Sequence, residues 1–232
     1  MTISSDPLTR PVWASLTSRH AALAEVCGLA AGYPGDVADL HAVADPLDRR
    51  AWADLAVLAG PATPITVPGG PDVPARGWAL HRRRSAVQLT GARIRTCRDP
   101  RVVTLTSADL AAMHALAQRA GTGRLWTRAL ALGQHLGVRR HGRLIAMAGE
   151  RLRPAGWAEI SSVHVDPAYA GRGWEAGIVA ALAHVIEERG ERPFLHILAS
   201  DAVRVRRFGA LGFTDRRPIT FHSYRRITTR RL

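Results

Sequence analysis

The segment "HVDPAYAGRGWEAGIVAAL" at residues 164–182 constrains the fold more than any other part of the chain. Its first residues continue a strand-like pattern that ends at Asp166-Pro167, and a helical pattern begins near Trp174. Gly171 and Gly173 lie between the two, so the amides of residues 171–176 can point at one anion beside the partial positive charge of a helix start. The segment therefore predicts a strand–turn–helix unit of an α/β fold. On this segment alone, a turn that holds a pyrophosphate and a turn that only connects two elements are equally supported.

The pattern around this segment predicts one mixed α/β sheet. We expect strands at 101–106, 136–140, 143–153, 157–165, 193–199 and 214–227, the last as one strand or two. Helical patterns cover 107–119, with Ser107 as its cap, and 124–132, 174–189 and 201–212. The order β-α-α-β-β-β-α-β-α-β is that of a mixed sheet with helices packed on it.

The part of the chain before residue 98 has a different pattern. Helices are expected at 10–26 and 46–59, a Pro- and Gly-rich loop at 60–77 with a short extended piece at Ile65 to Val67, and one or two strands at 78–91. We therefore predict two domains, a smaller α/β lead domain at 1–98 and the mixed α/β domain at 99–232.

Composition limits the classes of ligand and location. All 32 basic residues are arginine, and the net charge of +13 favours anionic ligands such as phosphate-bearing coenzymes, acidic substrates or nucleic acids. The sequence has no run long enough to span a bilayer and no signal-peptide pattern at its start, which predicts a cytoplasmic protein. Cys27 and Cys97 lie far apart and outside metal-ligand spacing, so we expect free, buried thiols and no metal site.

Residues 99 to about 218 resemble the GNAT superfamily of acetyl-CoA-dependent N-acetyltransferases. The resemblance rests on four ordered segments: "GRLIAMAGERLR" and "WAEISSV", then "VHVDPAYAGRGWEA", then "FLHILASDAVRVRRFGALGF". The N-terminal "PVWASLTSRHAALA" is similar to the lead domain of one branch of the family. The resemblance implies a GNAT-like fold, acetyl-CoA as cosubstrate, no metal, and an amine acceptor.

The resemblance also implies which residues bind acetyl-CoA. Main-chain groups of Val163, His164 and Val165 would bind pantetheine and polarise the acetyl carbonyl, and the turn would hold the pyrophosphate. The implied cofactor-binding set is Val163, His164, Val165, Gly171, Arg172, Gly173, Trp174, Glu175, Ala176, Asp201 and Phe208. Three residues of this set, and Ala170 beside it, depart from the family pattern. Ala170 stands in place of Gln or Arg, Glu175 in place of Gly or Ala, Asp201 in place of Asn, and Phe208 in place of a Tyr that protonates the leaving thiolate.

Glu159 is the candidate general base, because the resemblance places a base on the strand before the pantetheine segment. Alternation along a strand puts Glu159, Ser161, Val163 and Val165 on one face and His164 on the other, so Glu159 would reach the acceptor amine directly or through a water. A purely structural pairing of Glu159 with a neighbouring arginine is the alternative.

Three functions are thus open. The first is an N-acetyltransferase that moves the acetyl group of acetyl-CoA to a primary amine, on a small molecule or a peptide, by direct attack. The second is a degenerate GNAT domain that binds CoA or a partner without turnover, motivated by Ala170, Glu175 and Phe208. The third is nucleic-acid binding, which the dispersed arginines and the absence of a recognition motif do not favour. No membrane association is expected, and the acceptor and the oligomeric state cannot be read from the sequence.

Overall fold

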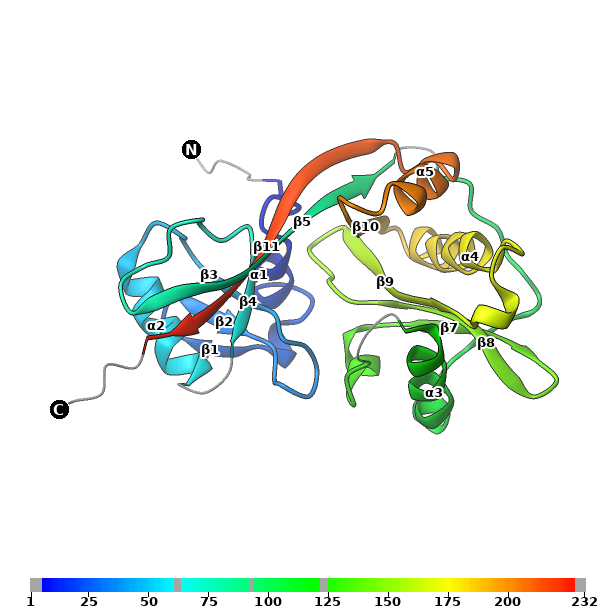
Figure 1. Cartoon of the computed structure of the whole chain (residues 1–232), viewed down its shortest axis with the longest axis horizontal. Coiled ribbons are helices and arrows are strands. Elements are labelled where there is room, and N and C mark those ends of the chain that lie inside the picture. The colour runs from blue at the N-terminus through cyan, green and yellow to red at the C-terminus, as the bar shows by residue number, and fades with distance from the viewer. Residues whose placement is uncertain (1–5, 61–63, 92–93, 122–124, 228–232) are drawn as a thin grey trace. The chain divides into compact units, whose positions relative to one another are not determined.

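Two long strands, β5 (Trp78–Thr90) and β11 (Asp215–Arg226), run through both of the compact units into which the chain divides. The structure, a computed structural model, describes residues 6–60, 64–91, 94–121 and 125–227 (Figure 1). Unit 1 comprises Met1–Ala86, Arg153–Ala155 and Pro218–Leu232, and unit 2 comprises Val87–Leu152 and Gly156–Arg217. The predicted division at residue 98 differs from these limits, because the partners of a strand cannot be read from the strand's own pattern.

Unit 2 contains the predicted mixed sheet. Its strands lie in the order β10-β9-β8-β7-β6, with the end of β5 beside β10. Strands β9 and β10 are parallel, and the pairs β9–β8, β8–β7 and β7–β6 are antiparallel. The bounds are β6 (Val102–Thr104), β7 (His135–Arg140), β8 (Arg143–Glu150), β9 (Trp157–Val165) and β10 (Arg192–Leu198). The prediction of a mixed α/β fold is confirmed.

The helices of unit 2 follow the predicted segments, with shorter bounds. They are α3 (Leu110–Ala120), α4 (Trp174–Glu188) and α5 (Ala202–Ala210), with short 3-10 helices at η2 (Ser107–Asp109), η3 (Ala129–Leu132) and η4 (Pro167–Tyr169). Thr106, not the predicted Ser107, caps the first of these segments, through a reciprocal capping box with Asp109. The helix predicted at 124–132 is reduced to η3, and residue 124 lies outside the described residues.

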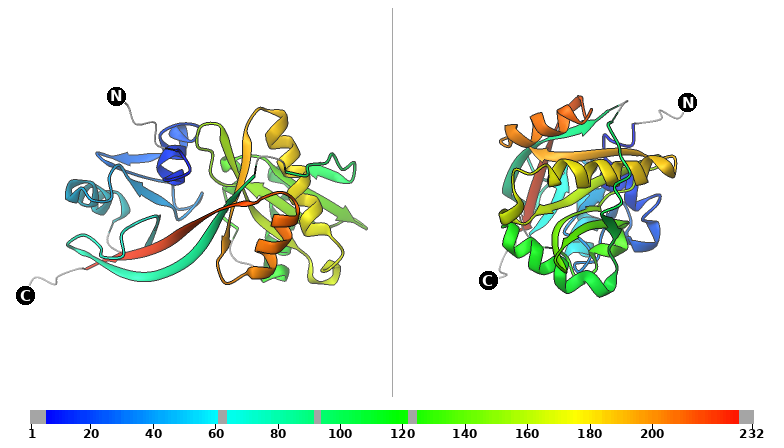
Figure 2. Two further views of the ribbon diagram at one scale, coloured as in Figure 1. Left: turned by 90° about the horizontal axis from the view of Figure 1, so that it is seen from above. Right: turned by 90° about the vertical axis from the view of Figure 1, so that its right-hand side faces the viewer.

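Helices α3 and α4 cover opposite faces of the unit 2 sheet (Figures 1 and 2). Helix α4 buries Ile178, Val179 and Leu182, as predicted, in a cluster that includes Ile160 of β9. Helix α3 packs Met113 and other apolar side chains against the opposite face. Burial of these apolar side chains supplies most of the free energy that holds each helix on the sheet.

Unit 1 is also α/β, as expected. It contains a three-stranded antiparallel sheet in the order β1-β2-β3, and β4 pairs with β11. Its core gathers Trp52, Trp78 and Tyr224 in edge-to-face contacts. The bounds are α1 (Pro11–Leu16), η1 (Ala21–Leu23), β1 (Glu25–Cys27), β2 (Ala30–Gly32), β3 (His41–Val43), α2 (Arg49–Ala59) and β4 (Ile65–Pro68).

Helix α1 is much shorter than the helix predicted at 10–26. The hydroxyls of Ser15, Thr17 and Ser18 donate hydrogen bonds to carbonyl oxygens four residues earlier, which competes with regular helix propagation. The chain then turns through η1 into β1, so the prediction was wrong for residues 17–26. None of the helices among the described residues is long and apolar enough to cross a membrane.

Candidate active site

The turn between β9 and α4 has the open geometry that its glycines predict. Gly171 has φ +74° and Gly173 has φ +80°, a left-handed conformation that glycine adopts without steric cost. A Cβ atom added to either residue would meet no described heavy atom within 4 Å. Gly173 is the N-cap of α4, and no side chain of the described residues caps this end. The start of α4 thus has no capping side chain among the described residues, and the space beside both glycines is open.

Asp166 fixes the start of the turn. One carboxylate oxygen accepts a hydrogen bond from the Ala168 amide at 3.1 Å, and the other accepts from Arg119 at 2.8 Å and from Arg143 at 2.7 Å. Burial raises the pKa of Asp166, but the Ala168 amide and the two guanidinium groups outweigh burial, so the pKa lies below its usual value. The carboxylate stays charged and holds the turn to α3 and β8.

Glu175 does not point into the open side of the turn. Its carboxylate accepts a hydrogen bond from the Arg204 Nε at 2.5 Å and also forms an ion pair with Arg207. Both arginines belong to α5. The Arg204 Nη2 donates to the Val163 carbonyl oxygen of β9 at 3.1 Å. The negative charge that Glu175 brings to the turn is thus compensated by two arginines, which the sequence reasoning did not identify.

A small pocket of about 90 Å³ lies on another flank of the same turn. Its lining includes Arg172, Gly173 and Trp174 of the turn together with Arg101, whose guanidinium lies 4.8 Å from the centre of the Trp174 ring. Arg140 lies 5.6 Å from the same ring. Asp99 also lines the pocket and pairs with Arg101 at 2.7 Å, so the arginines here exceed the carboxylates but Arg101 is already neutralised. The turn is therefore bordered by positive charge on this flank as well as beside α5.

A bulge in β9 decides which side chains share a face. Ser161 pairs with Gly149 and His164 pairs with Met147, so one extra residue of β9 stands between two residues on the same face of β8. Ser162 within this bulge has φ +49°. His164 therefore lies on the face of Ser161 and Glu159, whereas Val163 and Val165 pack toward the cluster under α4. The predicted alternation along 159–165 was wrong, because a regular period of two does not pass through a bulge.

Glu159 is completely buried in an ion-pair network. Its two oxygens contact Arg151 at 3.0 and 2.5 Å, and one of them also contacts the His196 Nδ1 at 2.8 Å. The His196 Nε2 lies 3.0 Å from the Gln88 side-chain nitrogen. Burial would raise the pKa of Glu159, but Arg151 and His196 lower it to about 2. The carboxylate is ionised at neutral pH, with 1% of its side chain exposed. The role of Glu159 as general base stays a prediction.

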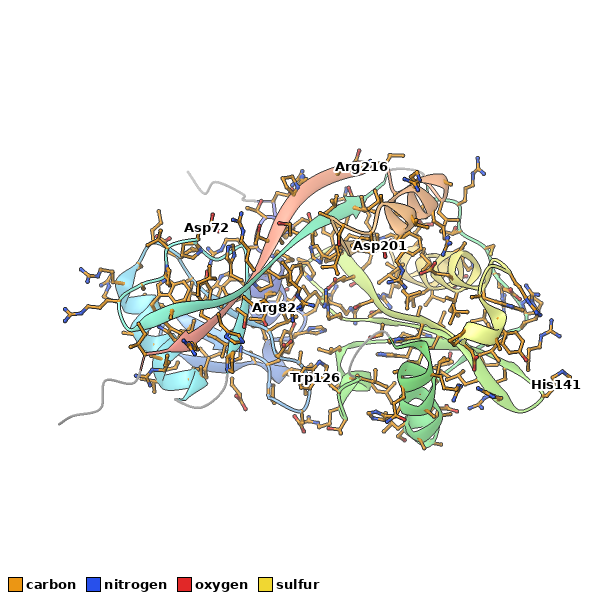
Figure 3. The ribbon with its side chains drawn as sticks, viewed as in Figure 1. Asp72, Arg82, Trp126, His141, Asp201 and Arg216 are labelled. Carbon is orange, nitrogen blue, oxygen red and sulfur yellow. The ribbon has the colours of Figure 1, made fainter. Side chains whose placement is uncertain are left out.

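Asp201 and Phe208 take structural positions on α5. Asp201 is the N-cap of α5 and its carboxylate accepts from the Arg204 amide at 3.0 Å (Figure 3). Phe208 is buried in the α4-side core and contacts the Phe213 ring edge to face. Their participation in cofactor binding stays a prediction.

The cysteines and the polar clusters add no metal centre. Cys27 and Cys97 are free, and Cys97 is exposed, contrary to the expected burial. Among the described residues, no group of three or more His, Cys, Asp or Glu side chains could hold a metal ion.

The burial of His164 on β9 leads to a testable prediction about its pKa. Burial first, and the charge of Arg204 second, lower its pKa from the usual 6.5 to about 4. Because the folded state binds the proton more weakly than the unfolded state, this histidine stabilises the fold fully above pH 6.5, and that contribution is lost as the pH falls toward 4. We expect the imidazole signals of His164, assigned with His164→Gln, to titrate near pH 4 in a ¹H–¹³C NMR experiment. A titration midpoint at or above pH 6.5 would contradict the buried position of the His164 imidazole.

Comparison with known proteins agrees with the geometry. The family described as FR47-like protein matches residues 135–225. A solved structure of a GNAT-family protein from Novosphingobium aromaticivorans DSM 12444 is 34% identical, covers 97% of this chain and 100% of its own, and superimposes with a TM-score of 0.87. A GCN5-related N-acetyltransferase from Kribbella flavida shares the fold at 16% identity, with 97% and 98% of the chains covered and a TM-score of 0.64. No curated protein sequence matches the chain.

The similarity to the Novosphingobium protein covers 97% of this chain and therefore extends over both units. The chain therefore belongs to the GNAT family of acetyltransferases.

Proposed function

We propose that this chain transfers the acetyl group of acetyl-CoA to a primary amine by direct attack of the amine on the thioester. The observation that carries the proposal is the open turn at Gly171 and Gly173, which leaves the first-turn amides of α4 uncapped by described side chains beside a basic pocket. In a GNAT chain this turn is suited to the diphosphate of acetyl-CoA. Residues 171–176 would contact the diphosphate.

The backbone of β9 supports the second part of the proposal. The bulge at Ser162 interrupts the regular pairing of β8 and β9, and Val163, His164 and Val165 follow it directly. Main-chain groups of these three residues would bind the pantetheine arm and polarise the acetyl carbonyl. Asp201 at the start of α5 and Phe208 in its last turn would border this arm.

Glu159 would act on the acceptor through a neighbouring group rather than by direct contact, because its side chain is buried and its oxygens are occupied. Its partner His196 is the group in place for this. The His196 side chain is only 2% exposed and its Nε2 lies 3.0 Å from the Gln88 side-chain nitrogen, so a proton of the acceptor amine would reach this pair through a water. The hydrogen bond to Glu159 would hold the His196 ring in one orientation.

The leaving thiolate has no phenol at position 208. Phe208 cannot donate a proton, so the thiolate of CoA would leave unprotonated, which a thiol with a pKa near ~8.5 can do. The buried position of Phe208 and the ion pairs of Glu175 favour a second candidate, a CoA-binding domain without turnover. Detectable turnover on any amine would exclude that candidate.

The test is acetyl transfer to a panel of small amines and peptide N-termini, with the acetylated product detected by mass spectrometry. A reagent that detects the thiol of released CoA is unsuitable here, because the exposed Cys97 of the protein would also react with it. We expect one class of amine to be acetylated and Glu159→Gln to lower kcat at least ~10²-fold, the usual effect of losing acid–base assistance. An unchanged kcat in a folded Glu159→Gln variant would limit Glu159 to a structural role. The cytoplasmic location and the nature of the acceptor stay predictions.

A further inference from the structure

A cluster of one glutamate and two arginines joins α4, α5 and β9 at the turn. Arg204 and Arg207 both hold the carboxylate of Glu175, and Arg204 also donates to the Val163 carbonyl oxygen. The Glu175 side chain is 12% exposed, against 30% for Arg204 and 45% for Arg207. The three side chains form a single contact, which we call the α4–α5 latch.

The charge of the latch does not balance. Within the latch two guanidinium groups face one carboxylate, and the N-terminus of α4 adds about half an elementary positive charge. The Asp201 carboxylate at the start of α5 also acts on Arg204 and offsets part of this charge. Ala170 contributes no polar side chain to the turn, and the Arg172 guanidinium lies over the Tyr169 ring at 5.6 Å. On the α5 side of the turn, Arg204 and Arg207 are therefore already paired with Glu175.

A diphosphate matches this cluster better than a carboxylate does. It carries more negative charge and presents oxygens to both guanidinium groups at once, the geometry that arginine recognises. The free amides at the start of α4 can bind the same ligand. The Glu175 side chain is mostly covered, so its release depends on movement of Arg207, which is 45% exposed.

We propose that Glu175 is a resident anion that a diphosphate-bearing ligand displaces from Arg204 and Arg207. In the free protein the two arginines hold Glu175, and in the complex they hold the diphosphate while Glu175 faces water. Arg204 and Arg207 are then ligand-binding residues, and Glu175 lowers the affinity by competing for them. This inference rests on the proposed use of acetyl-CoA only for the identity of the ligand, since inorganic pyrophosphate carries the same chemistry.

The first experiment compares Glu175→Gln with Glu188→Gln by calorimetric titration of inorganic pyrophosphate and of acetyl-CoA at low and moderate salt. Glu188 is a matched control, because it lies at the other end of α4 with its side chain 60% exposed and its removal changes the net charge equally. We expect Glu175→Gln to bind pyrophosphate at least ~10-fold more tightly than the wild type, and Glu188→Gln to stay within about twofold. Equal affinities of the two variants would overturn the proposal.

The second experiment compares Arg207→Gln with Arg206→Gln, the adjacent exposed arginine of α5. Arg207→Gln should weaken pyrophosphate binding at least ~5-fold relative to Arg206→Gln, since only Arg207 belongs to the latch. This pair keeps the proposal testable if Glu175→Gln fails to fold, which thermal unfolding will show. Equal binding by the two arginine variants would contradict it.

Comparing pyrophosphate with acetyl-CoA distinguishes a failure of the latch proposal from a failure of the proposed function. Tighter pyrophosphate binding by Glu175→Gln, with no acetyl-CoA bound by any variant, would support the latch and count against acetyl-CoA as the ligand. Equal acetyl-CoA binding by the wild type and Glu175→Gln would support the ligand and overturn the latch.

Discussion

Replacing Gly173 by glutamate will weaken acetyl-CoA binding by at least ~100-fold, a loss of about 3 kcal/mol in binding free energy. Gly173 has φ +80° and is the uncapped N-cap of α4, so any side chain at this position projects where the ligand must approach the amides. A carboxylate there adds direct repulsion of a diphosphate. The Kd is measured by calorimetry for the wild type and the variant.

Gly142→Glu is the matched control for this substitution. Gly142 has φ +75°, lies in the β7–β8 turn next to His141 (Figure 3), and has no described heavy atom within 4 Å of an added Cβ. Both substitutions introduce the same charge and a similar backbone cost, so they should lower the melting temperature equally. If both variants lost acetyl-CoA binding, or if neither did, the result would contradict the assignment of the turn as the acetyl-CoA site.

Replacing Glu159 by alanine will lower the free energy of unfolding by about 3 kcal/mol or more, because it leaves the Arg151 guanidinium and His196 without their buried anion. Glu188→Ala is the control and should stay within about 1 kcal/mol, since its carboxylate is exposed. Denaturant unfolding at pH 7 measures both. A change below 1 kcal/mol for Glu159→Ala would contradict the network.

The same carboxylate makes stability depend on pH in a defined window. The folded pKa of Glu159 is about 2 and its usual value is 4.5, so its contribution is complete above pH 4.5 and is lost as the pH falls to 2. The stability difference between the wild type and Glu159→Gln should shrink by about 3 kcal/mol over this range, since one pKa unit corresponds to ~1.4 kcal/mol. A constant difference would place the pKa of Glu159 near its usual value.

The sequence predicts local elements of this fold much better than their partners. The segment from β9 through the turn to α4 appears as expected, because it depends on alternation, glycines and a helical period within one stretch of chain. Strands β1, β2 and β3, each three residues long, are too short for any period to show. The division at Ala86 and Val87 depends on which strands β5 and β11 pair with, a long-range property.

The candidate site, like the fold, could be predicted from the sequence only where it depends on local residues. The open glycines of the turn follow from their residue type, and the structure places them as expected. The bulge at Ser162 moves His164 to the face of Glu159, and no local signal in "EISSVHV" marks the extra residue. The position of Glu175 became explicable only with Arg204 and Arg207, three residues apart on α5. That spacing puts them on one face of the helix, but the sequence does not show that the face meets α4.

The most direct test of this account is a calorimetric titration of acetyl-CoA into the wild-type chain at low and moderate salt. We expect saturable binding with one site per chain and a Kd that rises with salt, because arginines and a helix N-terminus would hold a multiply charged ligand. Absence of binding at both salt concentrations, in the wild type and in Glu175→Gln, would contradict the assignment of the turn as the acetyl-CoA site.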